Sequence, residues 1–276
     1  MVRLGQNFLA DPNLLEAIVA DAALDPEDVV LEVGGGEGVL TERLAGQVAH
    51  LHVIELDESL REPLGRIADA HPSVEIAWAD AMRFDLGSLT PAPTAMVANL
   101  PYSVATPLIL RTIAELPTLG RWTVMVQREI AERLRARPGS RSYGSPSVTV
   151  QLSCEVRMLR AVDPAVFSPR PRVDSAVLAL RRRGGRTVSA GTAQLIRDAF
   201  AHRRKALPKS LELAVRRREA EAERQGLPAP RPRSAEVRHR CREALAALGL
   251  PDGIRAEMLT PDQHLALAEA VAVEPS

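Results

Sequence analysis

Cysteines, aromatic residues and long apolar runs are scarce in this chain of 276 residues. The two cysteines, Cys154 and Cys241, cannot form a disulfide framework, and they lack the spacing of a cysteine metal site. No stretch reaches the roughly 18 apolar residues of a membrane span, and the first residues lack the apolar segment of a signal peptide. We therefore expect a cytoplasmic protein with no membrane partner and no metal site. We also expect it to be a monomer.

Lysine is almost missing as well, because Lys205 and Lys209 are the only lysines among 35 basic residues. The formal net charge of zero conceals an uneven distribution. Residues 1–120 contain 6 Lys and Arg against 18 Asp and Glu, whereas residues 121–276 contain 29 against 17. This asymmetry indicates that the second part meets a polyanion such as nucleic acid. The alternative is a solvated, arginine-rich surface.

Short apolar runs alternate with amphipathic stretches through the first part of the chain. Strands are predicted at 29–33, 51–55, 74–78, 95–98 and 122–126, and the β-rich segments 148–156 and 176–180 could complete the sheet. Helices are predicted between them at 39–44, 58–70 and 106–116, after a first helix that begins with Asp11 as N-cap and Pro12. Such alternation predicts an α/β fold with a doubly wound, Rossmann-like parallel sheet.

The pattern changes after Gly184, where only helical stretches follow. They are predicted at 192–201, 207–225, 235–248 and 261–271. We therefore predict a catalytic domain at 1–184 and a small all-helical domain at 185–276. The charged stretch from Arg216 to Arg233 is interpreted as a solvated helix and linker, with an RNA-contacting arm as the alternative.

Glycines follow the first predicted strand, in Gly34-Gly35-Gly36-Glu37-Gly38. They let the backbone turn sharply and approach a ligand closely, and the next helix offers free N–H groups. The spacing differs from the G-x-G-x-x-G of dinucleotide sites, so a pyrophosphate cofactor is less favoured. A simple tight turn is the alternative.

Carboxylates stand at the ends of the next two predicted strands. Glu55 can accept hydrogen bonds from two ribose hydroxyls, and Asp80 can accept one from an adenine amine. Either residue alone could be an ordinary exposed acid. In open α/β sheets ligands bind beyond the carboxyl ends of the strands, so Gly34, Gly36, Glu55 and Asp80 are candidate cofactor-binding residues.

The fourth predicted strand ends in Asn99-Leu100-Pro101-Tyr102. The N6 amine of adenine is a poor nucleophile because its lone pair is delocalised into the ring. Acceptors at the Asn99 side chain and the Leu100 carbonyl would localise that lone pair and aim it at the methyl group of a sulfonium donor, while Pro101 fixes the turn. Tyr102 can stack on the base. The alternative is a turn that closes a strand, with Tyr102 as a half-buried anchor.

A proline-rich segment between Phe167 and Ser175 is the second candidate for substrate contacts. Phe167 could stack on the other face of a flipped base, and Arg170 and Arg172 could meet phosphates. The alternative is a stiff connector with Phe167 in the core.

These motifs together resemble the ribosomal RNA adenine dimethyltransferases, above all the bacterial enzymes of the small-subunit (16S) RNA. The matching segments run in order along nearly the whole chain: Gly5-Gln6-Asn7-Phe8-Leu9, Leu31-Glu32-Val33-Gly34-Gly35-Gly36, Val53-Ile54-Glu55-Leu56-Asp57, Asp80-Ala81, Asn99-Leu100-Pro101-Tyr102, Tyr143-Gly144, the Phe167–Ser175 stretch and Phe200-Ala201-His202-Arg203-Arg204-Lys205.

The resemblance implies a methyltransferase that uses S-adenosyl-L-methionine and transfers two methyl groups to each of two adjacent adenosines near the 3′ end of 16S rRNA. The implied substrate is the pre-assembled 30S subunit. The implied cofactor contacts are Asn7, Leu9, Gly34, Glu55, Asp80 and Asn99. Arg203, Arg204 and Lys205, in the helical-domain signature, are candidate RNA contacts together with Arg170 and Arg172.

Three other functions are weighed against this one. A related enzyme that methylates one adenine of 23S rRNA and confers macrolide resistance would share the catalytic half. A non-catalytic ribosome assembly factor is disfavoured by the intact Glu55, Asp80, Asn99 and Tyr102. A nicotinamide dehydrogenase is disfavoured by the glycine spacing.

Overall fold

The structure, a computed structural model, describes residues 8–9, 11–184 and 188–272, and in this part of the chain two compact units form. The first unit contains the described residues up to 132 together with 154–184. The second contains 133–153 and the described residues after 184. The division into domains at residue 184 stays a prediction, and the segment 133–153 folds with the second unit.

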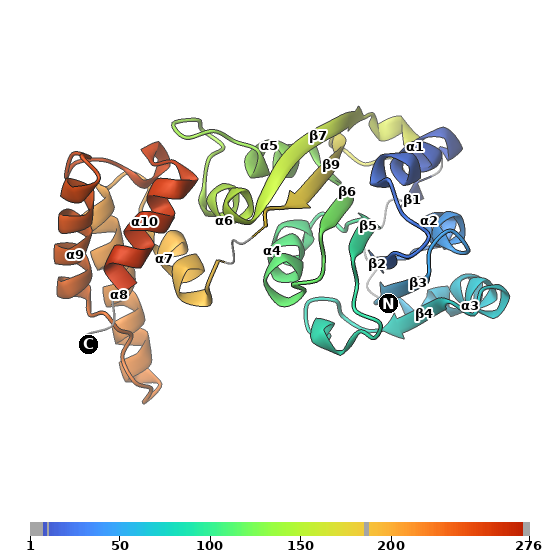
Figure 1. Cartoon of the computed structure of the whole chain (residues 1–276), viewed down its shortest axis with the longest axis horizontal. Helices are drawn as coiled ribbons and strands as arrows, with labels where there is room; N and C mark the ends of the chain where they lie inside the picture. The colour runs from blue at the N-terminus through green and yellow to red at the C-terminus, as the bar shows by residue number, and fades with distance from the viewer. Residues whose placement is uncertain (1–7, 10, 185–187, 273–276) are drawn as a thin grey trace. The chain divides into compact units, whose positions relative to one another are not determined.

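A seven-stranded sheet in the order β4-β3-β2-β5-β6-β9-β7 forms the centre of the first unit (Figure 1). Its strands are β2 (Val29–Val33), β3 (His50–Glu55), β4 (Val74–Trp78), β5 (Ala95–Asn99), β6 (Arg121–Gln127), β7 (Cys154–Val162) and β9 (Ser175–Arg182). The first five strands of this order are parallel, whereas β9 runs antiparallel to β6 and β7 antiparallel to β9. The predicted α/β, Rossmann-like fold is confirmed.

The helices of the first unit are α1 (Pro12–Ala22), α2 (Val39–Leu44), α3 (Arg61–Ala70) and α4 (Ala105–Glu115), and α5 (Arg128–Leu134) follows β6. Helices α1, α2 and α3 bury their apolar faces in one core with Val30, Leu51 and Val97 of the sheet. Successive side chains of a strand point to opposite faces. On the other face the Trp122 Nε1 donates to Thr112 Oγ1 of α4 at 3.0 Å. Helices thus cover both faces, and the strand ends remain as the place for a site.

Helix α1 begins as the sequence predicts. The Asp11 carboxylate accepts hydrogen bonds from the Asn13 and Leu14 amides at 2.8 and 3.1 Å, and Pro12 occupies the first turn. These contacts satisfy amides that have no partner within the helix. Strand β1 (Phe8–Leu9) pairs antiparallel with β8 (Phe167–Ser168), and the two form a small sheet separate from the main sheet.

The prediction of β structure at 148–156 is wrong for most of that segment, because Ser145–Ser153 forms helix α6 and only Cys154 onward belongs to β7. The alternation of Val148, Val150 and Leu152 mimics a half-buried strand. Hydrogen bonds from side chains of Ser145–Ser153 to carbonyls earlier in the chain favour the helix instead. Ser147 Oγ donates to the Arg133 carbonyl at 2.6 Å, and Gln151 Nε2 donates to the carbonyls that end the preceding helix. The segment 176–180 lies within strand β9, as predicted.

The second unit is helical in its described residues. It contains α6 and then α7 (Ala190–Phe200), α8 (Leu207–Arg224), α9 (Ser234–Ala247) and α10 (Pro261–Ala272). Short 3₁₀ turns in the whole described chain are η1 (Glu58–Leu60), η2 (Leu86–Ser88), η3 (Pro164–Val166) and η4 (Ala256–Met258). Leucine and valine side chains such as Leu211, Val237 and Leu267 form the core of this unit. Among the described residues, no helix has the length and apolar character needed to cross a bilayer.

Tyr143 anchors the segment 133–153 within the second unit. Its ring is fully buried and lies edge-on to Phe200, and its hydroxyl donates to the Leu259 carbonyl at 3.0 Å. Replacement by phenylalanine would leave that buried carbonyl without its donor. We expect Tyr143→Phe to lower the free energy of unfolding by about 1–3 kcal/mol in urea titrations.

Ser140→Ala is the matched control, because it removes a hydroxyl that donates to the exposed Arg137 turn. We expect it to change the free energy of unfolding by less than about 0.5 kcal/mol. Equal effects of the two substitutions would contradict the anchoring role of Tyr143.

Candidate active site

A pocket of about 460 Å³ opens at the carboxyl ends of β2, β3, β4 and β5. Its lining residues are Val33, Gly34, Gly36, Ile54, Glu55, Leu56, Ala79, Asp80, Ala81, Met82, Asn99, Leu100, Pro101, Tyr102, Ser103 and Val104. The glycine turn, both predicted carboxylates and the Asn99–Tyr102 turn therefore line one cavity. They converge because parallel strands end at a common edge of the sheet.

The glycine turn lies directly against the end of β5. Gly34 and Gly36 both have positive φ angles, of 82° and 57°, which side chains other than glycine adopt rarely. A Cβ on Gly34 would lie 3.7 Å from the Asn99 carbonyl oxygen. The Gly34 amide donates to the Ile54 carbonyl at 2.9 Å, which fixes the turn to the neighbouring strand.

Glu55 holds two loops with one carboxylate. Oε2 accepts a hydrogen bond from the Gly36 amide at 3.0 Å, and Oε1 accepts from the Leu56 and Asp57 amides, both at 2.8 Å. The side chain is almost fully buried. A carboxylate offers about four acceptor positions, so these three amides leave one of them for a ligand.

Asp80 lines the pocket with a carboxylate that is only partly occupied by the protein. Its Oδ1 accepts from the Met82 amide at 2.8 Å, while Oδ2 lies 3.7 Å from Nε of the exposed Arg83. The carboxylate is 42% exposed, so Asp80 can exchange water for a ligand donor. Leu56, Ala81 and Met82 supply apolar walls near it.

Glu32 is a feature of the site that the sequence analysis did not select. It lies in β2 one residue before the pocket-lining Val33, it is fully buried, and it accepts from Thr41 Oγ1 of α2 at 2.7 Å. Burial raises the pKa of Glu32 from 4.5 to about 8; the Thr41 hydrogen bond opposes this rise, and the charge of Glu55 adds to it. The signal in the sequence was an acidic residue inside an otherwise apolar strand.

The Asn99–Tyr102 turn presents polar groups to the pocket. The Leu100 amide donates to the Met125 carbonyl at 3.0 Å, and the Tyr102 hydroxyl lies 2.7 Å from Oγ of the buried Ser175 in β9. The backbone and the tyrosine ring are thereby fixed. Among the described residues, no hydrogen bond reaches the Asn99 side chain or the Leu100 carbonyl, so both remain available to a ligand.

Two predicted site residues in the described part of the chain, Phe167 and Leu9, do not line this pocket. Phe167 is 5% exposed and packs in the apolar core of the first unit, where its backbone pairs with Leu9, which is also buried. Base stacking by Phe167 and cofactor contact by Leu9 stay predictions. Asn7 lies outside the residues that the structure describes.

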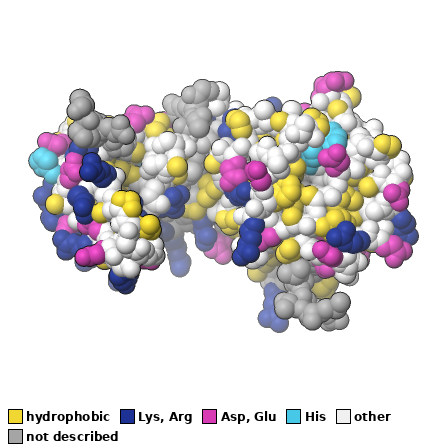
Figure 2. Space-filling view, turned by 90° about the horizontal axis from the view of Figure 1, so that it is seen from below, with side chains coloured by type: hydrophobic (Ala, Val, Ile, Leu, Met, Phe, Trp, Pro, Cys, Tyr) yellow, Lys and Arg dark blue, Asp and Glu magenta, His cyan; other side chains and the backbone are white. Residues whose placement is uncertain are grey.

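The five candidate RNA contacts are all exposed. In the first unit, Arg170 lies 3.6 Å from the Asp163 carboxylate, and both groups are open to solvent. In the second unit, Arg203 pairs with Glu257 at 3.1 Å and its Nη1 donates to the Arg141 carbonyl at 3.2 Å. Figure 2 shows several Lys and Arg side chains on the surface of the second unit, as the charge asymmetry of the sequence predicts.

Comparisons with known proteins agree on one family. The family model described as ribosomal RNA adenine dimethylase matches residues 2–230. Ribosomal RNA small subunit methyltransferase A of Rubrobacter xylanophilus is 42% identical over 98% of this chain and 94% of its own. The protein of the same name from Thermobifida fusca is 45% identical over 75% of each chain.

Solved structures show the same fold. The 23S rRNA methyltransferase ErmE has a TM-score of 0.64 and 26% identity, covering 96% of this chain and 99% of its own. A dimethyladenosine transferase from Plasmodium falciparum has a TM-score of 0.76 over 94% of this chain and 95% of its own, with 24% identity. The likeness to the Plasmodium protein shows the fold alone.

Glu32 makes stability depend on pH in a defined direction. Because its pKa is raised in the folded state, its contribution to stability is fully present below about pH 4.5 and is lost as the pH rises through about 8. Glu32→Gln keeps an acceptor for Thr41 and has no proton to lose. We expect the variant to be more stable than the wild type at about pH 8.5, and the difference to shrink at about pH 5.

Urea unfolding at the two pH values measures this difference. Glu62→Gln, at a carboxylate that is 84% exposed, is the control and should follow the wild type. A Glu32→Gln protein that loses stability in parallel with the wild type would show that Glu32 is ionised in the fold.

Proposed function

This chain belongs to the ribosomal RNA adenine dimethylase family, and from that premise we propose that it transfers two methyl groups from S-adenosyl-L-methionine to the N6 amine of each of two adjacent adenosines near the 3′ end of 16S rRNA. The observation that carries the proposal is the convergence of Asn99, Leu100, Pro101 and Tyr102 with the glycine turn, Glu55 and Asp80 on one pocket. The proposed substrate form is the pre-assembled 30S subunit.

The pocket residues fit a nucleoside with an attached amino acid. The one acceptor position left on Glu55 suits a ribose hydroxyl, and the partly exposed carboxylate of Asp80 suits an amine of the adenine. Leu56 and Met82 offer apolar surface to the flat base. The positive-φ glycines allow close approach of the backbone. When bound, S-adenosyl-L-methionine supplies a methyl group activated by the sulfonium charge.

The chain's own part in the reaction is the positioning of the substrate amine. We assign Asn99 Oδ1 and the Leu100 carbonyl as acceptors for the two N6 protons, which localises the nitrogen lone pair. Tyr102, held through its hydroxyl by Ser175, offers a ring for stacking on the base. No strong base is required, because displacement at a sulfonium leaves a neutral thioether. Orientation of the reacting atoms therefore supplies most of the rate enhancement.

The relatives that match this chain support the choice of RNA. Several curated proteins named ribosomal RNA small subunit methyltransferase A are 33–45% identical to this chain, whereas the 23S rRNA methyltransferase ErmE is 26% identical. The 16S substrate is therefore proposed over a 23S substrate. The polar groups that remain available at Asn99 and Leu100 favour an enzyme over a non-catalytic assembly factor.

Removal of the Asn99 acceptor tests the proposed mechanism. We expect Asn99→Ala to lower transfer of labelled methyl groups to under-methylated 30S subunits at least about a hundredfold, because the amine loses one of its two orienting acceptors. Binding of S-adenosyl-L-methionine, measured by calorimetry, should stay within a few-fold of the wild type. Asn13→Ala, the same substitution on the exposed surface of α1, is the control and should keep full activity.

Mass mapping of the methylated RNA separates the alternatives. Two adjacent dimethylated adenosines in 16S rRNA are expected. Methylation of 23S rRNA alone would contradict the proposed substrate. Wild-type turnover by Asn99→Ala would contradict the proposed mechanism.

We propose that Arg203, Arg204 and Lys205 contact RNA phosphates through their charges. Reversal of the three charges to Glu should weaken binding to 30S subunits and flatten the plot of log affinity against log salt by about 0.7–0.9 for each lost phosphate contact. Reversal of three exposed arginines of the solvated stretch, Arg217, Arg224 and Arg231, is the matched control. Equal salt slopes for the wild type and the first variant would exclude this cluster as an RNA contact.

A further inference from the structure

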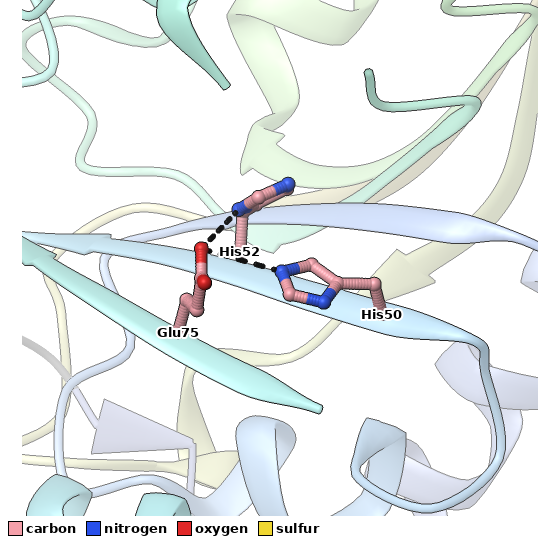
Figure 3. Close-up of side chains that lie close together, drawn as sticks. All are labelled: His50, His52 and Glu75. Atoms are coloured by element: carbon pink, nitrogen blue, oxygen red, sulfur yellow. Dashed lines mark ion pairs between the residues drawn. The ribbon is translucent and has the colours of Figure 1, made fainter. Parts of the chain in front are cut away.

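Two histidines and a glutamate meet on the sheet, away from the pocket at the strand ends. His50 and His52 lie two residues apart in β3, so both side chains point to the same face, and Glu75 pairs in register with His52 from the neighbouring strand β4 (Figure 3). Within the described residues, this is the group of three metal-ligating side chains whose ligand atoms all lie within 4.8 Å of one another.

The spacing of the ligand atoms is close to that of a metal site. Oε2 of Glu75 lies 3.4 Å from Nε2 of His50 and 3.6 Å from Nδ1 of His52. Ligands of a tetrahedral zinc ion lie about 2.0–2.1 Å from the metal, which places them about 3.3 Å from each other. The glutamate side chain is 63% exposed and free to adjust, and the two histidine ligand atoms lie within 4.8 Å of each other.

His52 is held in the tautomer that a metal ligand requires. Its Nε2 lies 2.8 Å from the Pro91 carbonyl, which can only accept, so Nε2 must carry the proton and donate. In this tautomer Nδ1 carries the lone pair, and Nδ1 faces the Glu75 carboxylate at 3.6 Å. Metal-bound histidines typically donate their other ring N–H to a backbone carbonyl in this way.

His50 completes the arrangement with an unsatisfied atom. Its Nε2 is buried and makes no hydrogen bond, although it faces the Glu75 carboxylate. The His52 side chain is also buried, with an exposed fraction of 3%. Buried polar atoms are nearly always paired, so a cation between these three groups would give the His50 Nε2 atom the partner that it lacks.

We propose that His50, His52 and Glu75 bind a divalent transition metal ion, with zinc as the preferred ion. Two imidazoles and one carboxylate suit zinc, nickel or copper, whereas magnesium and calcium require oxygen ligands. A groove of about 330 Å³, lined by His52 and Glu75 with Phe84 and Thr90 among others, gives access for the ion and for water as a fourth ligand.

The metal joins the edge strand of the sheet to its neighbour. Strand β4 lies at the end of the strand order, where its pairing with β3 alone holds it. Binding of an ion to the folded chain must stabilise it, since the three ligands come together only in the fold. This role is independent of methyl transfer, because the groove and the pocket share no lining residue.

Zinc titration of the chelator-treated full chain by calorimetry tests the site. We expect one equivalent of Zn²⁺ to bind with micromolar or tighter affinity, to raise the unfolding midpoint, and Mg²⁺ to do neither. Co²⁺ should give the visible absorption of a tetrahedral complex. Glu75→Gln and His50→Gln change exposed or partly exposed side chains and should each weaken binding at least about tenfold.

His239→Gln is the matched control, since His239 and Glu243 form an exposed histidine–glutamate pair at 3.3 Å in α9. It should keep the stoichiometry and the affinity of the wild type. Absence of saturable zinc binding, or equal affinity in the wild type and both site variants, would overturn the proposal. Methyl transfer by Glu75→Gln should stay at the wild-type rate, so a failed metal site leaves the proposed enzymatic function untouched.

Discussion

The Glu55 carboxylate is the contact on which the geometry of the pocket depends. It joins the glycine turn after β2 to the turn after β3 through three backbone amides. Each amide is part of a loop that has lost its regular strand partners, so an acceptor from a neighbouring strand replaces them. A ligand that takes the remaining acceptor position of Glu55 therefore contacts a carboxylate that the protein has already oriented.

The residues that meet at the pocket could be predicted because topology determines where they go. Gly34, Glu55, Asp80 and Asn99 each follow a strand, and parallel strands deliver their carboxyl ends to one edge. No local pattern reveals that Glu55 is mostly occupied by amides. The position of Glu32 inside an apolar strand hints at its burial, but not at a pKa raised to about 8. Those properties depend on neighbours that only the fold supplies.

Errors and omissions have the same origin. The alternation of Val148, Val150 and Leu152 resembles a strand, but hydrogen bonds to the end of α5 select a helix. The sequence leaves two interpretations of Phe167 open, base stacking or a place in the core; the structure buries Phe167 next to Leu9, and base stacking stays a prediction. His50 and His52 become a pair of ligands only when β4 brings Glu75 into register 23 residues later.

The path of the chain between the two units sets how this protein can be divided. It leaves the first unit after residue 132, returns at 154 and leaves again after 184. A fragment that stops at 184 would retain Tyr143, Val148 and Leu152 but lose Ile196, the buried partner of their cluster. Such a fragment would display an apolar surface and tend to aggregate. Exchange of helical units between relatives must therefore replace two stretches of sequence at once. The first unit can complete its sheet only after residues 133–153, which belong to the second unit, have been synthesised.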